Sequence, residues 1–322
     1  MRALALLSGG LDSSIAVRLM LDQGLEVVGV SFESPFFDAK GAAEAAEELG
    51  IELVVVDISE DILRILLAPK HGFGKHMNPC IDCHALMVRR ALAKMEELGA
   101  SFVVTGEVVG QRPKSQMRFG LEAVERESAA AGLLLRPLSA KLLPPTIPEQ
   151  RGWVDREKLL DLHGRTRKPQ FEFARSCGLE RFKSPAGGCL LADENYSRAL
   201  RDLRDHGQLS VGAVRLLKTG RQFRISERTK LVVGRNQAEN ATLSELTPEG
   251  DLALRAIDRK GPVAVLAGGA SDEDARTAAA IVASYADAGP SDEVRVQLRG
   301  GGRALEVTVA PLPRDQVRAF AI

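Results

Sequence analysis

The chain has 322 residues and carries 43 Lys and Arg against 43 Asp and Glu, so its formal net charge at pH 7 is zero. This length allows two or three domains, each with its own core. A balanced charge gives no general attraction to DNA or to an anionic membrane, so any RNA contact must be local. No apolar run approaches the roughly 20 residues of a membrane span. Met1-Arg2 leads directly into an apolar run, so we expect a cytoplasmic protein without a signal peptide.

Strands and helices alternate in the first 140 residues. Apolar runs predict strands at 3–7, 26–32, 51–56, 102–105 and 133–138, and helical spacing predicts helices at 15–21, 39–49 and 81–98. Residues 68–79 are rich in Gly, His and Pro and are expected to form a loop. This alternation favours an α/β fold with a parallel sheet covered on both faces, whose ligands bind beyond the carboxyl ends of the strands.

Three prolines, Pro144, Pro145 and Pro148, interrupt the regular pattern after the last of these strands. We therefore expect a first domain at 1–145, a basic and mostly helical segment at 146–225, and a small α+β domain at 226–322. Four cysteines in a chain of this size do not indicate a disulfide framework, so a C-x-x-C pair favours metal or redox chemistry.

The string Ser8-Gly9-Gly10-Leu11-Asp12-Ser13-Ser14 joins the first predicted strand to the first helix. The first N–H groups of a helix have no partner within it and attract an anion. Glycines allow close approach of the backbone, and the serines add hydroxyl donors. The lysine of a Walker loop is missing. An N-capped helix after a glycine turn explains these residues one by one, but not the whole string.

This string resembles the PP-loop of the ATP pyrophosphatases, which adenylate a carbonyl oxygen and release pyrophosphate. The resemblance implies a fold like that of the adenine nucleotide alpha hydrolases over 1–145, with ATP bound as its Mg²⁺ complex. It implies that Asp12 holds Mg²⁺ or orients the phosphates. The residues expected to bind the phosphates are Ser8, Gly9, Gly10, Asp12, Ser13 and Ser14.

The segment Thr105-Gly106-Glu107 with Gln111 resembles a nucleotide-binding strand end of the 4-thiouridine synthetases. Thr105, Gly106 and Gln111 are therefore expected to bind ATP. Phe32 lies at the end of the second predicted strand, where related domains contact adenine. The structural alternatives are a strand that runs into a polar loop and a phenylalanine of the core.

The string Asn78-Pro79-Cys80-Ile81-Asp82-Cys83-His84 places two thiols at the start of a predicted helix, a position that lowers a thiol pKa. Cys189 follows the small residues of Ser184-Pro-Ala-Gly-Gly, whereas Cys177 has no such context. Both segments resemble those of the bacterial tRNA 2-thiouridylases, in which an Asn-Pro-x-x-x-Cys loop and a second cysteine after a glycine-containing turn are catalytic. By position, Cys83 and Cys189 match these two cysteines.

Cys80 adds a third thiol, and the set then resembles that of iron–sulfur-dependent tRNA thiolases. This resemblance implies that Cys80, Cys83 and Cys189 hold a [4Fe–4S] cluster, whose fourth iron can bind an exogenous sulfide. Two alternatives stay open. One is a structural zinc completed by His84 or His76, and the other is a redox dithiol.

Two segments are locally basic. Residues 151–183 contain nine Lys or Arg against five Asp or Glu, and residues 198–235 contain ten against three. They flank Cys189, which favours a polyanion footprint over two solvated helical faces.

The string Lys230-Leu-Val-Val-Gly-Arg-Asn236, with Asn240 after it, resembles the RNA-binding module of the NFACT family. Ala253 and Arg255 stand where that family carries a tryptophan and a histidine. The ring surfaces that would stack on bases are therefore missing at these positions.

Together these features predict an ATP-dependent tRNA sulfurtransferase with Asp12, Cys83 and Cys189 as catalytic residues. It would adenylate a base carbonyl and replace its oxygen with sulfur, delivered by the cluster or by a persulfide on Cys189. The expected partners are tRNA and a sulfur donor, either sulfide or a persulfide carrier such as a cysteine desulfurase. A PP-loop ligase or small-molecule thiolase and a non-enzymatic RNA- or ribosome-binding protein are the alternatives.

Overall fold

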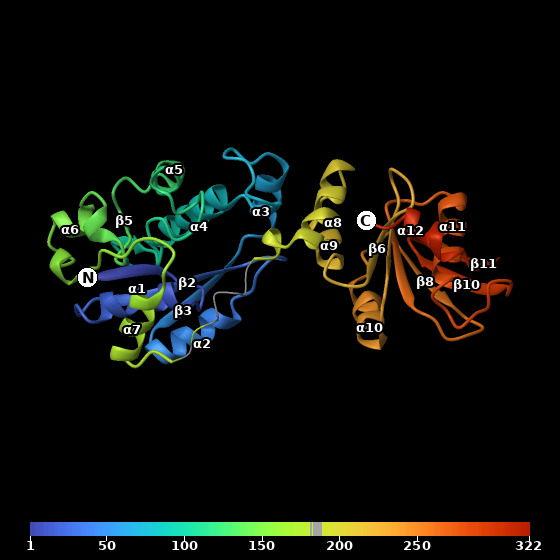
Figure 1. Ribbon diagram of the computed structural model, residues 1–322, viewed down its shortest axis with the longest axis horizontal. Coiled ribbons are helices and arrows are strands. Elements are labelled where there is room, and N and C mark those ends of the chain that lie inside the picture. Colours follow the sequence, from blue (N-terminus) through green and yellow to red (C-terminus); the bar gives the residue numbers. More distant parts are fainter. Residues whose placement is uncertain (181, 183–188) are drawn as a thin grey trace. The chain divides into compact units, whose positions relative to one another are not determined.

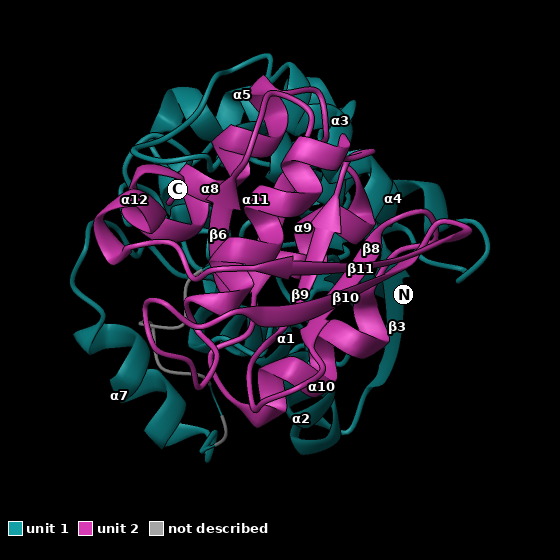
Figure 2. Ribbon diagram, turned by 90° about the vertical axis from the view of Figure 1, so that its right-hand side faces the viewer, with its two compact units in different colours: residues 1–193 teal, residues 194–322 magenta. Residues whose placement is uncertain are grey.

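The computed structural model describes residues 1–180, 182 and 189–322 (Figure 1). The chain divides into two compact units, residues 1–193 and residues 194–322 (Figure 2). This division differs from the boundaries expected near residues 145 and 225. Val154, Leu159 and Ala174 are buried in the core of unit 1, so the segment after the prolines continues that unit.

Unit 1 is built on a five-stranded parallel sheet with the order β3-β2-β1-β4-β5. Its strands are β1 (Arg2–Leu6), β2 (Glu26–Glu33), β3 (Glu52–Asp57), β4 (Phe102–Val104) and β5 (Leu134–Leu135). All three residues of β4 are buried, as in a central strand covered on both faces. The predicted parallel α/β domain is thereby confirmed.

The helices of unit 1 form two layers around this sheet. α1, α2 and α7 pack together on one side, and α3, α4 and α5 on the other (Figure 1). Their bounds are α1 (Leu11–Leu21), α2 (Lys40–Leu49), α3 (Ser59–Leu67), α4 (Cys80–Lys94), α5 (Arg118–Ser128), α6 (Ile147–Gln150) and α7 (Lys168–Ser176). α1 begins at Leu11, earlier than predicted, so the turn after β1 is short. α3 and α5 were not predicted, although Ile62, Leu63 and Leu66 have helical spacing in α3.

Unit 2 has an antiparallel sheet with the order β11-β10-β8-β9-β7-β6. The strands are β6 (Arg221–Arg224), β7 (Lys230–Val233), β8 (Leu252–Ala256), β9 (Val263–Ala267), β10 (Val294–Gly300) and β11 (Arg303–Val309). The helices are α8 (Glu194–Asp205), α9 (Val211–Leu216), α10 (Gln237–Leu246), α11 (Asp272–Ala283) and α12 (Arg314–Ala319). This confirms a β-rich α+β unit after the parallel domain.

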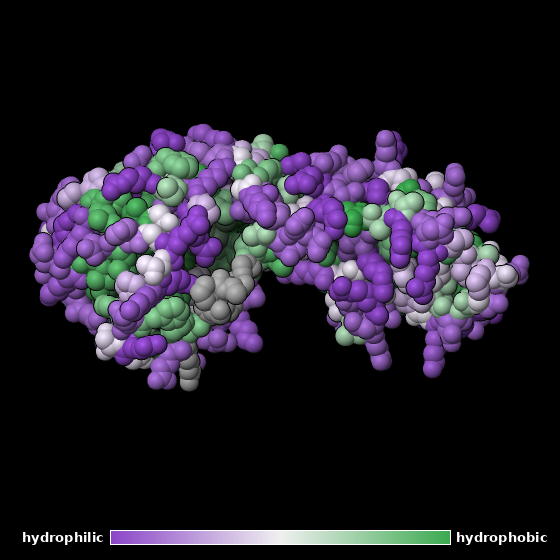
Figure 3. Space-filling view, viewed as in Figure 1, coloured by the Kyte–Doolittle hydropathy of each residue, from purple (hydrophilic) through white to green (hydrophobic). Residues whose placement is uncertain are grey.

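The core of unit 2 lies between one face of this sheet and α11, where Leu254, Val296 and Ile281 are fully buried. Hydrophilic side chains cover most of the surface that Figure 3 shows, as expected when apolar residues fill two separate cores. In the part of the chain that the structure describes, no helix is both long and apolar enough to cross a membrane.

Candidate active site

The turn after β1 leaves the N-terminus of α1 without a capping side chain. Its N-cap residue, Gly10, has an extended backbone and no side chain to accept a hydrogen bond from the first turn. The hydroxyls of Ser13 and Ser14 donate to the Gly10 carbonyl over 2.8 and 3.3 Å, and Ser8 Oγ lies 3.3 Å from Ser13 Oγ. The serines therefore shape the loop, while the helix N–H groups suit an anion.

Two glycines allow this loop to contact other backbone segments directly. Gly9 has φ +73°, and a Cβ there would lie 2.1 Å from the carbonyl oxygen of Gly41 at the start of α2. A Cβ on Gly106 would lie 2.5 Å from the backbone carbon of Asp12. The segment after β4 thus meets the first turn of α1 by main-chain contact, which no larger residue would permit.

The carboxylate of Asp12 binds two side chains from distant parts of unit 1. Gln111 Nε2 donates to Asp12 Oδ2 over 2.7 Å, and Arg167 Nη2 donates to the same oxygen over 2.7 Å. Gln170 Nε2 in turn donates to Gln111 Oε1 over 2.8 Å. The structure therefore brings the predicted residues Asp12 and Gln111 together and adds Arg167 and Gln170, which were not predicted.

Main-chain pairing carries Arg167 to this place. Val109 and His163 form a parallel bridge, and Gly164 N donates to the Val109 carbonyl over 2.8 Å. The chain then enters α7, which packs on α1. In the sequence Arg167 is one of nine cations of a basic segment, and no local pattern distinguishes it from the others.

Three buried polar atoms of this network have no hydrogen-bond partner among the described residues: Asp12 Oδ1, Arg167 Nε and Gln170 Oε1. One is a carboxylate acceptor and one a guanidinium donor. A free carboxylate oxygen suits a hard cation such as Mg²⁺, and a free guanidinium N–H suits a phosphate oxygen. The residues present therefore fit a magnesium–triphosphate group at this position.

Thr105 and Phe32 are placed in the interior of unit 1. The Thr105 hydroxyl donates to Glu107 Oε2 over 3.2 Å, and Phe32 is 6% exposed, near the end of β2. These placements agree with the structural alternatives for both side chains. Their predicted contact with ATP stays a prediction.

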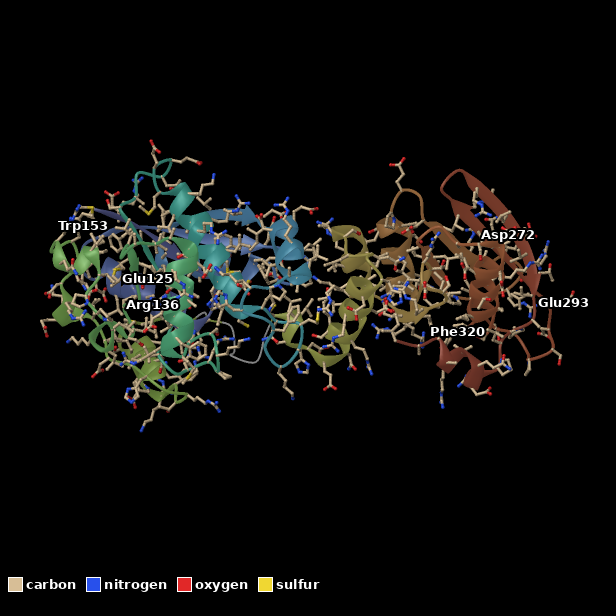
Figure 4. The ribbon with its side chains drawn as sticks, turned by 90° about the horizontal axis from the view of Figure 1, so that it is seen from above. Glu125, Arg136, Trp153, Asp272, Glu293 and Phe320 are labelled. Carbon is tan, nitrogen blue, oxygen red and sulfur yellow. The ribbon has the colours of Figure 1, made fainter. Side chains whose placement is uncertain are left out.

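A buried ion-pair network lies beside the cysteine helix α4. Arg136 Nε donates to Glu107 Oε2 over 2.9 Å, and His84 Nδ1 lies 2.9 Å from Glu107 Oε1. Arg136 also lies 3.5 Å from Glu125, and the two labelled side chains are neighbours in Figure 4. Burial opposes ionisation of Glu107, but Arg136 and the hydrogen bond to His84 outweigh it and lower the pKa of Glu107 to about 2.

We expect the substitution Arg136→Met to destabilise unit 1 by about 3–5 kcal/mol, because it removes the main partner of a buried carboxylate. Urea denaturation would measure this loss. The double variant Glu107→Gln/Arg136→Met should recover part of it. Arg64→Met, at a side chain 74% exposed, should change stability by less than about 0.5 kcal/mol.

The lowered pKa of Glu107 makes this contribution to stability depend on pH. The stabilisation by ionised Glu107 is present above pH 4.5 and is lost as the pH falls toward 2. Equal stability of wild type and Arg136→Met would contradict the prediction.

The loop before α4 is folded around Asn78. Its Oδ1 accepts from His76 N over 3.1 Å, and its Nδ2 donates to Cys80 Sγ over 3.2 Å. A Cβ on Gly74 would lie 2.4 Å from the Asn78 amide. Asp82 accepts from His71 N over 3.0 Å and so holds the other end of the loop. The loop thus fixes the first turn of α4, which carries Cys80 and Cys83.

Burial and neighbouring thiols raise the pKa of two predicted site cysteines, Cys83 and Cys189. Burial, then the neighbouring Cys189 and Cys80, raise the pKa of Cys83 far above its ordinary value. Burial also raises the pKa of Cys189 to about 11, with Cys80 adding to the effect. In these shifts the charges of Cys189 and Cys80 act on Cys83, and the charge of Cys80 acts on Cys189. That the three thiols form one site stays a prediction. The expected lowering of the Cys83 pKa by its helix start was wrong, because burial outweighs the helix dipole.

Cys177 lies elsewhere. It ends α7, and the charges that act on it are those of Arg18 and Asp22, at the far end of α1 from the PP-loop. The small-residue turn at 184–188, expected to admit a substrate to Cys189, lies outside the described residues.

Thiolates are the ligands that both zinc and iron–sulfur clusters prefer, so the donor set fits such a centre in kind. Among the described residues, however, no three His, Cys, Asp or Glu side chains are arranged to hold a metal ion. His84, one of the two histidines proposed to complete a zinc site, already contacts Glu107 through Nδ1.

The two basic segments fall in different units, and part of their charge is neutralised internally. In 151–183, Arg156 pairs with Glu149 and Arg167 pairs with Asp12. In 198–235, Arg224 and Lys230 both bind Asp202. Burial lowers the pKa of Lys230 to about 8, although Asp202 opposes the shift. A single basic surface beside Cys189 stays a prediction.

Comparisons with known proteins agree with the PP-loop resemblance of the first part of the chain and with the NFACT resemblance of the last part. Residues 1–141 match the family model of the thiamine biosynthesis protein (ThiI), and residues 220–321 match that of the NFACT protein RNA binding domain. The tRNA-specific 2-thiouridylase MnmA of Acidothermus cellulolyticus is 33% identical over 164 residues, which cover 42% of this chain and 44% of that protein. The MnmA of Geobacter metallireducens is 26% identical over 238 residues, which cover 66% and 61%.

Among solved structures, a 4-thiouridine synthetase–RNA complex with bound ATP is 29% identical, covers 43% of this chain and 37% of that chain, and gives a TM-score of 0.35. The chain spans less than two thirds of the length of these curated relatives. The matches therefore agree with the predicted PP-loop domain in the first part of the chain and with an NFACT-type segment in the last part.

Proposed function

We propose that this PP-loop protein is an ATP-dependent tRNA sulfurtransferase that adenylates a carbonyl oxygen of a uridine or cytidine and replaces it with sulfur. The observation that supports the proposal is the meeting of Gln111 and Arg167 at the PP-loop carboxylate of Asp12. The same unit contains Cys83 and Cys189, which lie more than a hundred residues apart in the sequence. The matched relatives are named as tRNA-specific 2-thiouridylases, which supports tRNA as the substrate class.

In the first step, the base oxygen attacks the α-phosphorus of ATP, an O–P bond forms, and pyrophosphate leaves. The N–H groups at the start of α1 would bind the phosphates. Asp12 would hold Mg²⁺ through the oxygen that lacks a partner among the described residues, and this ion would balance the charge of the triphosphate. Arg167 would add positive charge where pyrophosphate departs.

In the second step, a sulfur nucleophile attacks the adenylated carbon, the C–O bond to AMP breaks, and a C–S bond remains. In the persulfide route, the persulfide carrier first gives Cys189 an outer sulfur, and this sulfur attacks the carbon. The Cys83 thiolate then attacks Sγ of Cys189, the S–S bond to the transferred sulfur breaks, and the resulting Cys83–Cys189 disulfide is reduced by an external thiol. Cys80 favours the alternative in which all three thiolates hold a [4Fe–4S] cluster. When bound, such a cluster would supply sulfide at an iron without a protein ligand.

Nucleoside mass spectrometry of tRNA from a strain that lacks the gene tests this function. We expect the loss of one thiolated uridine or cytidine and its return when the wild-type gene is supplied. An unchanged set of thionucleosides, together with ATP turnover by the purified protein without RNA, would instead favour a PP-loop ligase or small-molecule thiolase.

We expect the substitution Arg167→Ala to lower kcat/KM for AMP formation about a hundredfold, the usual cost of losing one charged donor at a developing anion. Arg167→Lys should recover only part of the rate, because lysine keeps the charge but not the fork of donors. Steady-state kinetics with ATP as the varied substrate would separate kcat from KM.

Added guanidinium ion should partly restore Arg167→Ala, which a purely structural role would not allow. The control is Arg175→Ala, on an exposed turn of the same helix α7. If Arg167→Ala and Arg175→Ala have equal rates, Arg167 has no part in the chemistry.

A further inference from the structure

One face of the sheet in unit 2 is only partly covered by helices. α10 packs on β9 at this face, where Leu243 clusters with Val232 and Val265. Beyond this cluster, the side chains of β8, β10 and β11 on this face are exposed or half-buried. Side chains on neighbouring strands are separated only by the distance between two paired strands. We call this surface the open sheet face. Its members are Ala253, Arg255, Arg295, Gln297, Arg299, Ala304, Glu306 and Thr308.

The strand register makes these residues neighbours. Gln297 stands opposite Arg255 on one side and Glu306 on the other, and Arg299 stands opposite Ala253 and Ala304. Directly opposed residues of antiparallel strands project to the same face and touch. The open sheet face is therefore one continuous surface.

This surface is basic. It carries three arginines, Arg255, Arg295 and Arg299, against one acid, Glu306. Arg295 is 56% exposed and lies 3.4 Å from Glu306, which is 47% exposed. Arg255 Nη2 donates to Gln297 Oε1 over 3.3 Å. Exposed contacts of this kind are weak and can be exchanged for a phosphate.

The other side of the sheet has the opposite character at the start of α11. Asp272, Glu273 and Asp274 fill the first turn of that helix, which covers the apolar face. The open sheet face is thus basic and the first turn of α11 is acidic, although the whole chain is neutral. The charge of Arg224 and Lys230 does not add to either face, because both bind Asp202.

The chemistry of the open sheet face suits phosphates better than bases. It includes no aromatic side chain, so bases have no ring on which to stack. A guanidinium fork binds a phosphate with two parallel hydrogen bonds. Arg295 and Arg299 are four residues apart on one strand, about 13 Å by the rise of a strand, so they would contact different phosphates.

We propose that the open sheet face binds the phosphodiester backbone of tRNA. This inference rests on the proposed function, because it names the surface that holds the substrate of that reaction. Backbone contacts carry no sequence information, so the face would bind tRNA species alike, and its affinity would fall steeply with salt.

Filter binding of the full chain to unfractionated tRNA, over a series of salt concentrations, tests the proposal. The triple variant Arg255→Glu/Arg295→Glu/Arg299→Glu should weaken binding at least tenfold and reduce the slope of log affinity against log salt by about 2 to 3, near one per lost phosphate contact. The control, Arg276→Glu/Arg314→Glu/Arg318→Glu, makes the same charge change at exposed positions of α11 and α12. It should bind like wild type.

A Gln variant at the same three positions, which removes charge without reversing it, should give an intermediate loss. Circular dichroism would confirm that each variant is folded. The proposal is overturned if the open-face variants and the control bind tRNA equally, with equal salt slopes. Wild-type protein that binds tRNA through this face but leaves its nucleosides unthiolated would contradict the proposed function alone.

Discussion

Replacing Asp12 with alanine should abolish Mg²⁺-dependent formation of AMP and pyrophosphate. Asp12 is the carboxylate of the PP-loop, with one oxygen bound by Gln111 and Arg167 and the other buried without a partner among the described residues. Its removal would eliminate the expected Mg²⁺ ligand and leave Arg167 without its counter-ion. We expect a loss of at least a thousandfold, since both the metal and the orientation of the phosphates are affected. Release of AMP and of pyrophosphate from labelled ATP would measure it.

Asp12→Asn distinguishes charge from shape. It keeps the size of the side chain and an oxygen for Gln111, but it cannot neutralise a cation, so its activity should also be lost. Asp22→Ala is the matched control, because Asp22 caps the other end of the same helix and pairs with Arg18 at a half-exposed position. Full turnover by Asp12→Ala would disprove the assignment of this loop as the ATP site.

Serine at Cys80, Cys83 or Cys189 should abolish tRNA thiolation, whereas Cys177→Ser should not. Cys80 and Cys189 add to the raised pKa of Cys83, and Cys80 adds to that of Cys189, whereas Cys177 interacts with a different set of charges. After anaerobic purification, the wild type should contain about four irons per chain, and each of the three serine variants should lose them. Iron analysis and visible absorption would measure the cluster, and nucleoside analysis would measure thiolation.

Metal content and the activity of Cys80→Ser distinguish the cluster from a structural zinc site and from a persulfide route. Stoichiometric zinc without iron after anaerobic reconstitution would favour a structural zinc site. Undiminished thiolation by Cys80→Ser would favour a persulfide on Cys189, because that route needs only two thiols. Either result would contradict the cluster while leaving the adenylation chemistry in place.

The parallel sheet, the PP-loop and the β-rich C-terminal unit could all be predicted from local sequence patterns. Each depends on residues close together in the chain. The all-apolar run of β4 indicates a buried strand, and the glycines and Asp12 lie within one turn. Hydrophobic periodicity and turn chemistry are local properties, so they can be read without knowing which segments meet.

The distant side chains that complete the site could not be predicted, because they meet through the folding of segments far apart in the sequence. Arg167 reaches Asp12 because the chain pairs His163 with Val109, and Glu107 is enclosed by Arg136 and His84. The net charge of a segment and the pKa of a side chain also depend on contacts between distant segments. A basic stretch in the sequence proved partly neutral because Asp202 binds two of its cations, and burial raised the pKa of Cys83 where its helix position alone predicted a decrease. Burial and ion pairing depend on packing between segments far apart in sequence, which no local pattern records.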